Sequence, residues 1–361
     1  MTSRSLCTVL SLAALALPAA LLPSAAQAAD PTVHLNLYGN VNYAVEKEGD
    51  APTTNTFSVP NFDLFFSSEL DKLTFSAEVL FDFDGDTNEI TVDLDRVQLS
   101  YAFRSWLRMT VGRFHNAIGY YNTAYPHGAA FYEMAIDRPA LVDSHEVDSI
   151  VPTLGVGLRL DGRIPVGAAG FVSYDLDVTN GRGIEPGEVT TFIDHNRSKA
   201  YNLRLRFEPA FLDGLIIGGN AYIDKIPTDM LGLAVGMQEQ VFGAHIAYVE
   251  SPYHLILEGV MVRHLGDDGS KFQTLAALAQ VGYSFGDFTP YARVELARFP
   301  KGTPDPFYSL GAQLERGDYL AVSAGLKYVV SSSLALKLEL EDNHADANDI
   351  KSATTQAAFA F

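Results

Sequence analysis

The chain has 361 residues and a formal net charge of −19, with 47% hydrophobic and 19% charged residues. Nucleic-acid binding depends on neutralising phosphates with Lys and Arg, so this acidic balance argues against a nucleic-acid partner. After the first 28 residues no segment approaches the roughly 18 to 20 apolar residues of a membrane-spanning helix, which excludes helical membrane spans.

Residues 1–28 have the features of a Sec signal peptide. Arg4 precedes an apolar run, and the small residues of AQA at 26–28 form a cleavage site. We therefore expect cleavage before Ala29 and export through the inner membrane of a Gram-negative cell. The only cysteine, Cys7, leaves with this segment, which excludes disulfides and cysteine metal sites from the mature chain.

The remaining sequence alternates apolar and polar residues with the period of a β-strand. Near the end of the chain, Leu336, Leu338 and Leu340 share one face, whereas Lys337 and Glu339 share the other. In a soluble sandwich the apolar face would meet a second sheet, and in an outer-membrane barrel it would meet lipid; periodicity alone fits both. The pattern predicts sixteen strands, over residues 34–45, 57–70, 72–83, 90–103, 106–113, 153–161, 168–178, 199–208, 214–224, 239–250, 253–264, 272–285, 287–298, 318–330, 333–341 and 351–361.

The connections between these strands are long after odd-numbered strands and short after even-numbered ones. Transmembrane barrels have this arrangement, with short periplasmic turns and long extracellular loops. Aromatic residues beside the short turns, such as Tyr101 and Trp106, also suit the headgroup level of a membrane. We therefore predict an all-β fold in which residues 29–361 form a single 16-stranded antiparallel transmembrane β-barrel, with both termini on the periplasmic side.

The mature chain resembles the Gram-negative outer-membrane porin superfamily. The resemblance is carried by a first strand HLNLYGNVNYAV, by the strands TPYARVEL and ALKLELED, and by the terminal Phe361. It implies a place in the outer membrane, contact with membrane lipid and lipopolysaccharide, and assembly as a homotrimer. It also implies that the barrel-insertion machinery recognises Phe361.

A narrower resemblance covers residues 111–183. The segments VGRFHNAIGYYNT, YPHG and NGRG are similar to those of a set of porin-like proteins without an assigned substrate, which carry GRFH, GYxNT, HG and NGRG at similar intervals. These shared residues could shape a loop without taking part in any chemistry, so no catalytic role is inferred from them.

The longest connection, residues 114–152, is expected to fold into the barrel and narrow the pore, as the resemblance implies for a loop in this position. Loops of this length are usually functional. Its acidic residues are predicted to line the constriction: Glu133, Asp137, Asp143 and Glu146. Strand parity predicts that the inward basic residues are Arg96, Arg108, Arg159, Arg204, Arg206, Arg293, Lys327 and Lys337, the first five on one wall.

An acidic loop facing arginines would create a transverse field that orients dipolar solutes and penalises apolar ones. Alternatively, the arginines pair with inward acids such as Glu78 and Glu295 and hold the wall together. Inward acids outnumber inward bases, which favours weak cation preference, although arginines clustered at the narrowest point would reverse it.

Other chemistry is weakly indicated. Asp82, Asp84 and Asp86 form a D-x-D-x-D candidate for calcium, but Thr87 stands where a calcium loop has glycine, so a solvated acidic turn fits better. The spacing of His115, His127 and His145 matches no metal signature. No strained nucleophile turn accompanies Ser144-His145-Glu146, so we expect neither a cofactor nor an enzymatic activity.

The sequence therefore favours a porin for passive diffusion of small hydrophilic solutes or ions. A porin selective for an anion, such as a carboxylate or phosphate solute, is the first alternative, because of the arginine wall. An occluded barrel with a surface-binding or lipid-modifying role is the second.

Overall fold

The computed structural model describes residues 31–84, 89–126, 131–142, 149–182, 198–226, 236–308, 317–345 and 349–361. The predicted signal peptide over residues 1–28 lies outside this part of the chain, as do Asp86, His127, Asp143, His145 and Glu146. None of the described helices is long and apolar enough to cross a membrane.

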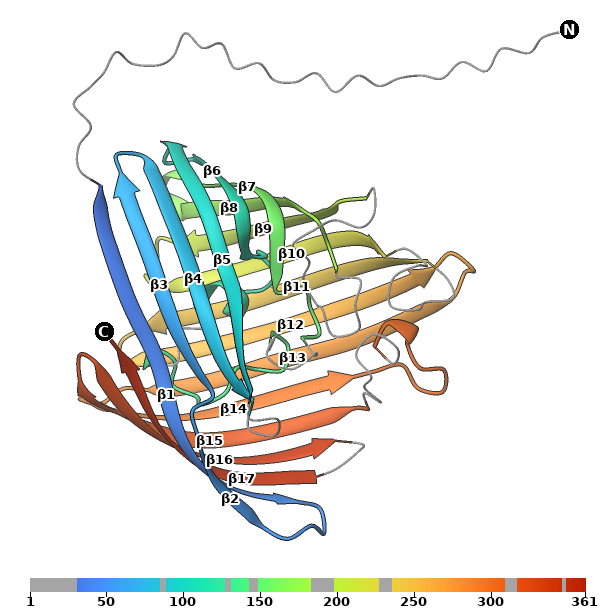
Figure 1. Cartoon of the computed structure of the whole chain (residues 1–361). Helices are drawn as coiled ribbons and strands as arrows, with labels where there is room; N and C mark the ends of the chain where they lie inside the picture. Colours follow the sequence, from blue (N-terminus) through green and yellow to red (C-terminus); the bar gives the residue numbers. More distant parts are fainter. Residues whose placement is uncertain are drawn as a thin grey trace, which may run out of the picture.

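The described residues form one closed antiparallel sheet (Figure 1). Each strand pairs with the next in sequence, except that β2 and β3 both pair with β1, and β1 also pairs with β17. The strands are β1 Thr32–Glu48, β2 Thr54–Ser58, β3 Asn61–Leu70, β4 Leu73–Asp84, β5 Glu89–Arg104, β6 Leu107–His115, β7 Leu154–Pro165, β8 Gly170–Thr179, β9 Ala200–Pro209, β10 Leu215–Ile226, β11 Met237–Glu250, β12 Tyr253–Gly266, β13 Lys271–Tyr283, β14 Phe288–Arg298, β15 Tyr319–Ser331, β16 Leu334–Ala345 and β17 Asp349–Ala360. The short helices are α1 Tyr121–Ala124 and the 3-10 turn η3 Gly167–Ala169.

The strands β2 and β3 are two parts of a single crossing, because both pair with β1 and only Val59 and Pro60 separate them. Proline has no backbone N–H to give to a sheet, so the ladder breaks there. The barrel therefore has sixteen crossings, and each of the sixteen predicted strands has a counterpart. The prediction of an all-β, 16-stranded antiparallel barrel is confirmed.

The apolar residues of each strand face outward and the polar residues face the interior. On β9, Leu203 and Leu205 are about half exposed, whereas Asn202, which precedes them, and Arg204, which lies between them, are buried. The same alternation runs through β16, where Leu336 and Leu338 are exposed and Lys337 is buried. The strands close on themselves instead of pairing face to face with a second sheet, which rules out the sandwich that periodicity left open.

A β-bulge at Asp95 preserves this sorting along β5. Its apolar residues occupy even positions up to Leu94 and odd positions from Val97 onward. The β4 register shifts at the same point, where Glu78 pairs with Arg96 but Val79 pairs with Leu94. The extra residue lets Asp95 and Arg96 both approach the interior while the apolar side chains stay outside.

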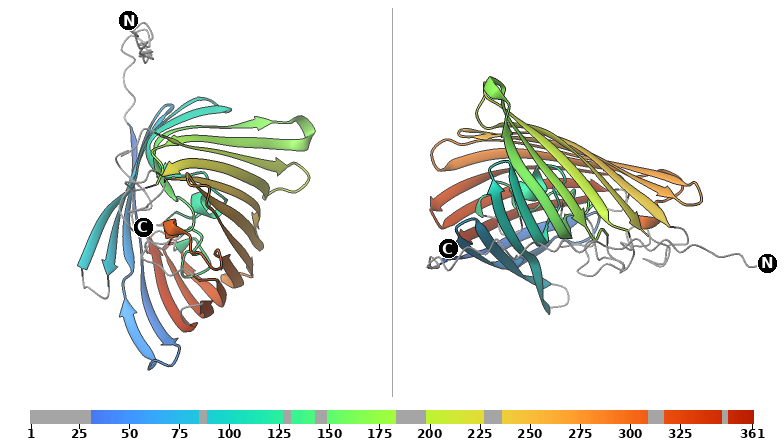
Figure 2. Two further views of the ribbon diagram at one scale, coloured as in Figure 1. Left: turned by 90° about the vertical axis from the view of Figure 1, so that its right-hand side faces the viewer. Right: turned by 90° about the horizontal axis from the view of Figure 1, so that it is seen from above.

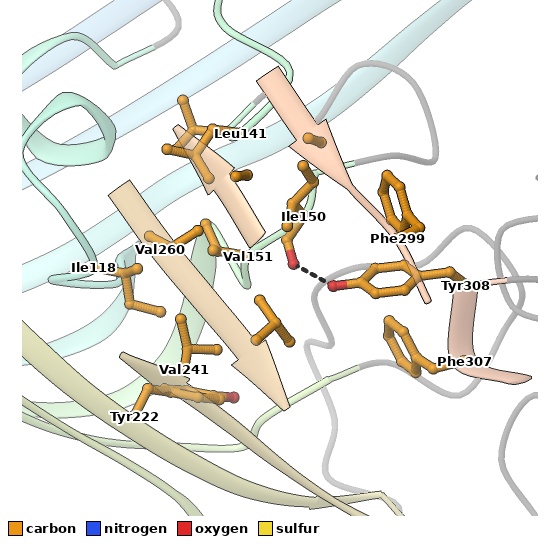
Figure 3. Packing of buried hydrophobic residues seen from close by; sticks show 14 of the residues in the cluster. Ile118, Leu141, Ile150, Val151, Tyr222, Val241, Val260, Phe299, Phe307 and Tyr308 are labelled. Carbon is orange, nitrogen blue, oxygen red and sulfur yellow. Dashed lines mark hydrogen bonds between the residues drawn. The ribbon is translucent and has the colours of Figure 1, made fainter. Parts of the chain in front are cut away.

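The segment between β6 and β7 lies inside the barrel, where α1 is enclosed by the strands (Figure 2). Ile118, Leu141 and Val151 of this segment pack against Val241 of β11 and Val260 of β12 in one buried cluster (Figure 3). A 2.9 Å hydrogen bond from the Tyr308 hydroxyl to the carbonyl oxygen of Ile150 closes the other end of that cluster. An apolar core thus fills the interior beside β10 to β14.

Candidate pore-lining site

Two asparagines fasten the ends of the β6–β7 loop to each other. The Asn116 amide donates to the carbonyl oxygens of Pro152 (3.1 Å) and Leu154 (3.0 Å). The Asn122 amide donates to those of Asn116 (2.9 Å) and Thr153 (2.8 Å). Both asparagines are buried and both belong to the VGRFHNAIGYYNT segment, so this motif shapes the loop.

The first part of the loop is held by inward side chains of the wall. Asp177 of β8 accepts the backbone N–H of Ala117 at 2.9 Å, and Asn220 of β10 accepts that of Gly119 at 3.0 Å. The carboxylate of Glu258 on β12 accepts two successive backbone N–H groups, at 2.8 and 2.9 Å, from Tyr120 and Tyr121. These bonds carry the chain across the barrel to α1.

Gly119 is required where the loop passes Glu258. Its φ of +66° lies in the left-handed region that side chains disfavour. A Cβ at this position would also overlap the Glu258 carboxylate. The turn therefore needs glycine for both conformation and space.

The second described part of the loop, residues 131–142, is held by the next stretch of the wall, β14 to β16. Lys327 of β15 donates to the carbonyl oxygens of Phe131 and Tyr132, the latter at 3.0 Å. Lys337 of β16 donates to that of Ala135 at 2.8 Å. Further bonds join Arg293 to the carbonyl of Asp137 (2.6 Å), and the N–H of Ala140 to Glu295 (2.9 Å).

Each of the five arginines predicted for the pore wall is paired with an acidic side chain. The pairs are Arg96 with Glu78, Arg108 with Asp161 (2.9 Å), Arg159 with Asp177 (2.6 Å), Arg204 with Asp175 (2.9 Å) and Arg206 with Asp175 (3.2 Å). These contacts match the alternative in which the arginines brace the wall. Arg108 and Arg206 stay the most accessible, with side chains 55% and 27% exposed.

The loop acid Glu133 lies on a different wall from these arginines. It is buried, and it accepts a 3.0 Å hydrogen bond from the Gln280 amide, which in turn accepts one from Arg293 at 2.7 Å. Burial by itself would raise the pKa of Glu133, but the electrostatic effects of Arg293 and His254 lower it below the ordinary value. The side chain of Asp137 is exposed. Asp143 and Glu146 lie outside the described residues.

Strand parity did not predict the buried cluster around His115. His115 lies with Nε2 3.1 Å from Asp95 and Nδ1 3.3 Å from the Asn122 oxygen. Glu78, Asp95 and His115 offer ligand atoms within 4.8 Å of one another, but the Arg96 guanidinium already supplies the positive charge there. The change in apolar parity between Leu94 and Val97 is the sequence signal that would have placed Asp95 inside.

The calcium candidate is described only in part. Asp82 lies on β4 opposite Thr91. The side chain of Asp84 and the whole of Asp86 fall outside the described residues, so the D-x-D-x-D site stays a prediction.

The NGRG motif builds a buried charge network near the long-loop rim. Gly181, with φ +81°, brings the N–H of Arg182 within 2.9 Å of Asp224. The Arg182 guanidinium pairs with Glu239 at 3.0 Å, and His264 lies 3.2 Å from the same carboxylate. A second carboxylate, that of Asp305, lies 2.6 Å from the other nitrogen of His264.

This network also reaches the β6–β7 loop. Arg182 donates a 2.9 Å hydrogen bond to the carbonyl oxygen of Ile150. Since Tyr308 donates to the same oxygen, three separate connections of the barrel meet there. The motif is therefore explained by loop packing in the part that is described, Asn180 to Arg182.

No protein-family model matches the sequence, and no curated protein matches it. Solved structures do share the architecture. The anion-selective porin from Comamonas acidovorans has a TM-score of 0.63 with 10% identity, covering 92% of this chain and all of that one. The fold is that of outer-membrane porins.

Two further solved structures agree. OmpF of Salmonella typhi, in complex with daunomycin, has a TM-score of 0.59 and 14% identity, covering 91% of this chain and 97% of that one. OmpT, an outer membrane protein of Vibrio cholerae, in a trimer form, has a TM-score of 0.58 and 11% identity, covering 92% and 99%. At these identities the similarity establishes the fold alone.

Proposed function

We propose that this chain is an outer-membrane channel through which small hydrophilic solutes or ions diffuse passively. The observation that carries the proposal is the closed barrel with an apolar outside and, on the inner wall from β4 to β9, a series of charged pairs. An apolar outer face suits contact with membrane lipid and lipopolysaccharide, whereas charges on the inside suit a watery bore. The location would be the outer membrane of a Gram-negative cell.

The orientation follows from the two rims. Short turns such as Ser251-Pro252 lie on one rim, together with the end of the chain at Phe361, and the long connections lie on the other. By analogy with membrane barrels the short-turn rim is periplasmic. Phe361 is 71% exposed, which leaves it accessible to the barrel-insertion machinery. The signal peptide over residues 1–28 would be removed on export.

The β6–β7 loop would narrow the channel. Two of its described parts, residues 116–126 and 131–142, are bound to β8–β12 and to β14–β16 respectively, so passage is restricted to the interior that the loop leaves open. We keep the residues predicted from the sequence as the proposed constriction, with Glu133 on a different wall from the arginines. These residues are Arg96, Arg108, Arg159, Arg204, Arg206, Glu133, Asp137, Asp143 and Glu146. Alternating charges at close range stabilise polar solutes and penalise apolar ones.

Conductance in a planar lipid bilayer tests the proposal. Refolded protein should produce stable steps of current that are linear in voltage. Absence of steps at every protein concentration would instead support the occluded barrel. Assembly as a homotrimer is proposed separately, and its test is a high-mass gel band that heating converts to monomer; a single monomer band without heating would contradict it.

A further inference from the structure

Arg206, Gly218 and His245 stand side by side on three neighbouring strands. Gly218 of β10 is opposite Arg206 of β9 on one side and opposite His245 of β11 on the other. A Cβ at Gly218 would overlap the His245 ring and lie 2.9 Å from Cγ of Arg206. The missing side chain therefore lets the imidazole and the arginine stem meet in one corner of the interior wall.

Three buried nitrogens of this corner have no hydrogen-bond partner in the part of the chain that the structure describes. His245 is only 2% exposed, and neither of its ring nitrogens has a hydrogen-bond partner among the residues that the structure describes. The buried Nε of Arg206 likewise has none within the described ranges. Buried polar groups are normally hydrogen-bonded, and an imidazole N–H and a guanidinium N–H both require an oxygen acceptor.

The charge of the corner also points to an anion. Arg204 and Arg206 share one carboxylate, that of Asp175, at 2.9 and 3.2 Å. The second arginine therefore has no carboxylate of its own in this contact. Glu258, opposite His245 across the β11–β12 ladder, is turned to the loop, where it accepts backbone N–H groups.

A row of partly exposed rings begins at the same place. The Tyr120 ring lies 6.0 Å from that of His245 and 6.5 Å from that of Tyr125, between ring centres. The Tyr125 ring in turn lies 6.2 Å from that of His254. Tyr120, Tyr125 and His254 are all partly exposed. Flat faces at such spacings suit contact with another planar group.

We propose that this corner binds the carboxylate of a small aromatic acid. The carboxylate accepts from Arg206 and His245, which supplies the missing acceptor. The planar body of the solute lies along Tyr120, Tyr125 and His254. The proposal deepens the channel function, because a site of this kind would select such acids among the solutes that pass.

Calorimetry with benzoate on the detergent-solubilised full barrel tests binding without depending on conduction. Acetate and inorganic phosphate serve as comparison probes that carry the oxyanion without the ring. Benzoate should bind more tightly than either. Arg206→Gln should raise the Kd for benzoate roughly tenfold or more, the size expected for losing a charge-assisted contact.

The matched control is Arg163→Gln. Arg163 stands at the same level of the wall, opposite Ser173, which is itself opposite Arg206. It is paired with Glu208 at 2.7 Å and belongs to no part of the proposed corner. The substitution Arg163→Gln removes the same charge as Arg206→Gln. A similar loss of benzoate affinity in both variants would show a general field effect and overturn the proposal.

The role of His245 has its own pair of variants. His245→Phe keeps a ring but removes the N–H donor, and should weaken benzoate binding, whereas His245→Gln keeps a donor and should restore part of it. Equal binding in both, or no benzoate binding by wild-type protein that conducts, would overturn this proposal and leave the channel function intact. Benzoate binding by a barrel that never conducts would instead contradict the channel function alone.

Discussion

Arg204, on the barrel wall, donates a 2.8 Å hydrogen bond to the carbonyl oxygen of Gly119, inside the barrel. On the far side of the same turn, Glu258 accepts the N–H groups of the next two residues. The wall thus supplies both a donor and an acceptor to one turn of the β6–β7 loop. The path of the loop is consequently set by the side chains of Arg204 and Glu258, which lie 85 and 139 positions after Gly119 in the sequence.

Replacing Glu258 by alanine should loosen this turn. Two backbone N–H groups would lose their acceptor, at a cost of about 1–3 kcal/mol for each buried donor. The thermal unfolding midpoint should fall, and open-channel current noise should rise as the loop gains freedom. Glu258→Gln retains an acceptor oxygen and should recover most of the stability; identical behaviour of both variants would show that the turn does not depend on these bonds.

Gly119→Ala should destabilise the barrel more than Gly167→Ala. The two glycines have nearly the same φ, +66° and +65°, so the conformational cost of a side chain is similar at both. Only at Gly119 would the new methyl group overlap another group, the Glu258 carboxylate, because no atom lies within 4 Å of the position at Gly167. We expect a difference of about 1–3 kcal/mol in the free energy of unfolding. Equal costs would show that Glu258 moves aside freely.

Arg182→Met should be strongly destabilising. It leaves the buried carboxylate of Glu239 without its guanidinium, and breaking a buried pair from one side costs about 3–5 kcal/mol. Denaturant unfolding in detergent measures the loss. The control is Arg163→Met, whose half-exposed pair with Glu208 should contribute about 0–1 kcal/mol. Similar losses in the two variants would mean that the network is not a stabilising unit.

Acidification should weaken the attachment of the loop through Glu133. Its pKa is lower in the folded protein than in the unfolded chain, so the ionised carboxylate contributes stability above the ordinary glutamate pKa. That contribution is lost as the pH falls through the lowered pKa. Unfolding midpoints at pH 7 and pH 3 should therefore differ less in Glu133→Gln than in the wild type. Glu69→Gln, at an exposed carboxyl of β3, should leave the difference unchanged. An unchanged difference in Glu133→Gln would contradict the prediction.

Deleting residues 120–145 should raise single-channel conductance. This segment includes α1 and the carbonyl groups that Lys327 and Lys337 bind, so its removal opens the interior. Bilayer recordings of the deletion variant measure the change, and circular dichroism confirms that the strands persist. A folded deletion variant with unchanged conductance would show that the loop does not limit the flow.

Much of the barrel was predictable because strand periodicity is a local property. The alternation at Leu336, Lys337 and Leu338 can be recognised from adjacent residues alone. Each predicted strand overlaps an observed one. Parity also placed Arg159 and Arg204 inside, where both are found. It erred where a bulge adds a residue, so Asp95 was missed although the sequence carries the change of parity.

The contact partners of those side chains could not be predicted from the sequence. Glu133 was expected to face the β5 to β9 arginines, yet it meets Gln280, 147 positions away, on a different wall. Arg206 and His245 meet because Gly218 lies between them in the sheet. That position depends on the register of three strands, which the residue composition does not reveal.

By itself the sequence determined that the chain forms sixteen antiparallel crossings, apolar on one face and polar on the other, because a two-residue repeat needs only adjacent residues to be read. Only the tertiary structure decided that the β6–β7 loop is bound to the wall from several sides. It also decided which acid neutralises which arginine, and which donors have no acceptor among the described residues. Those contacts join residues tens to hundreds of positions apart, and closure of the barrel is what brings them within reach.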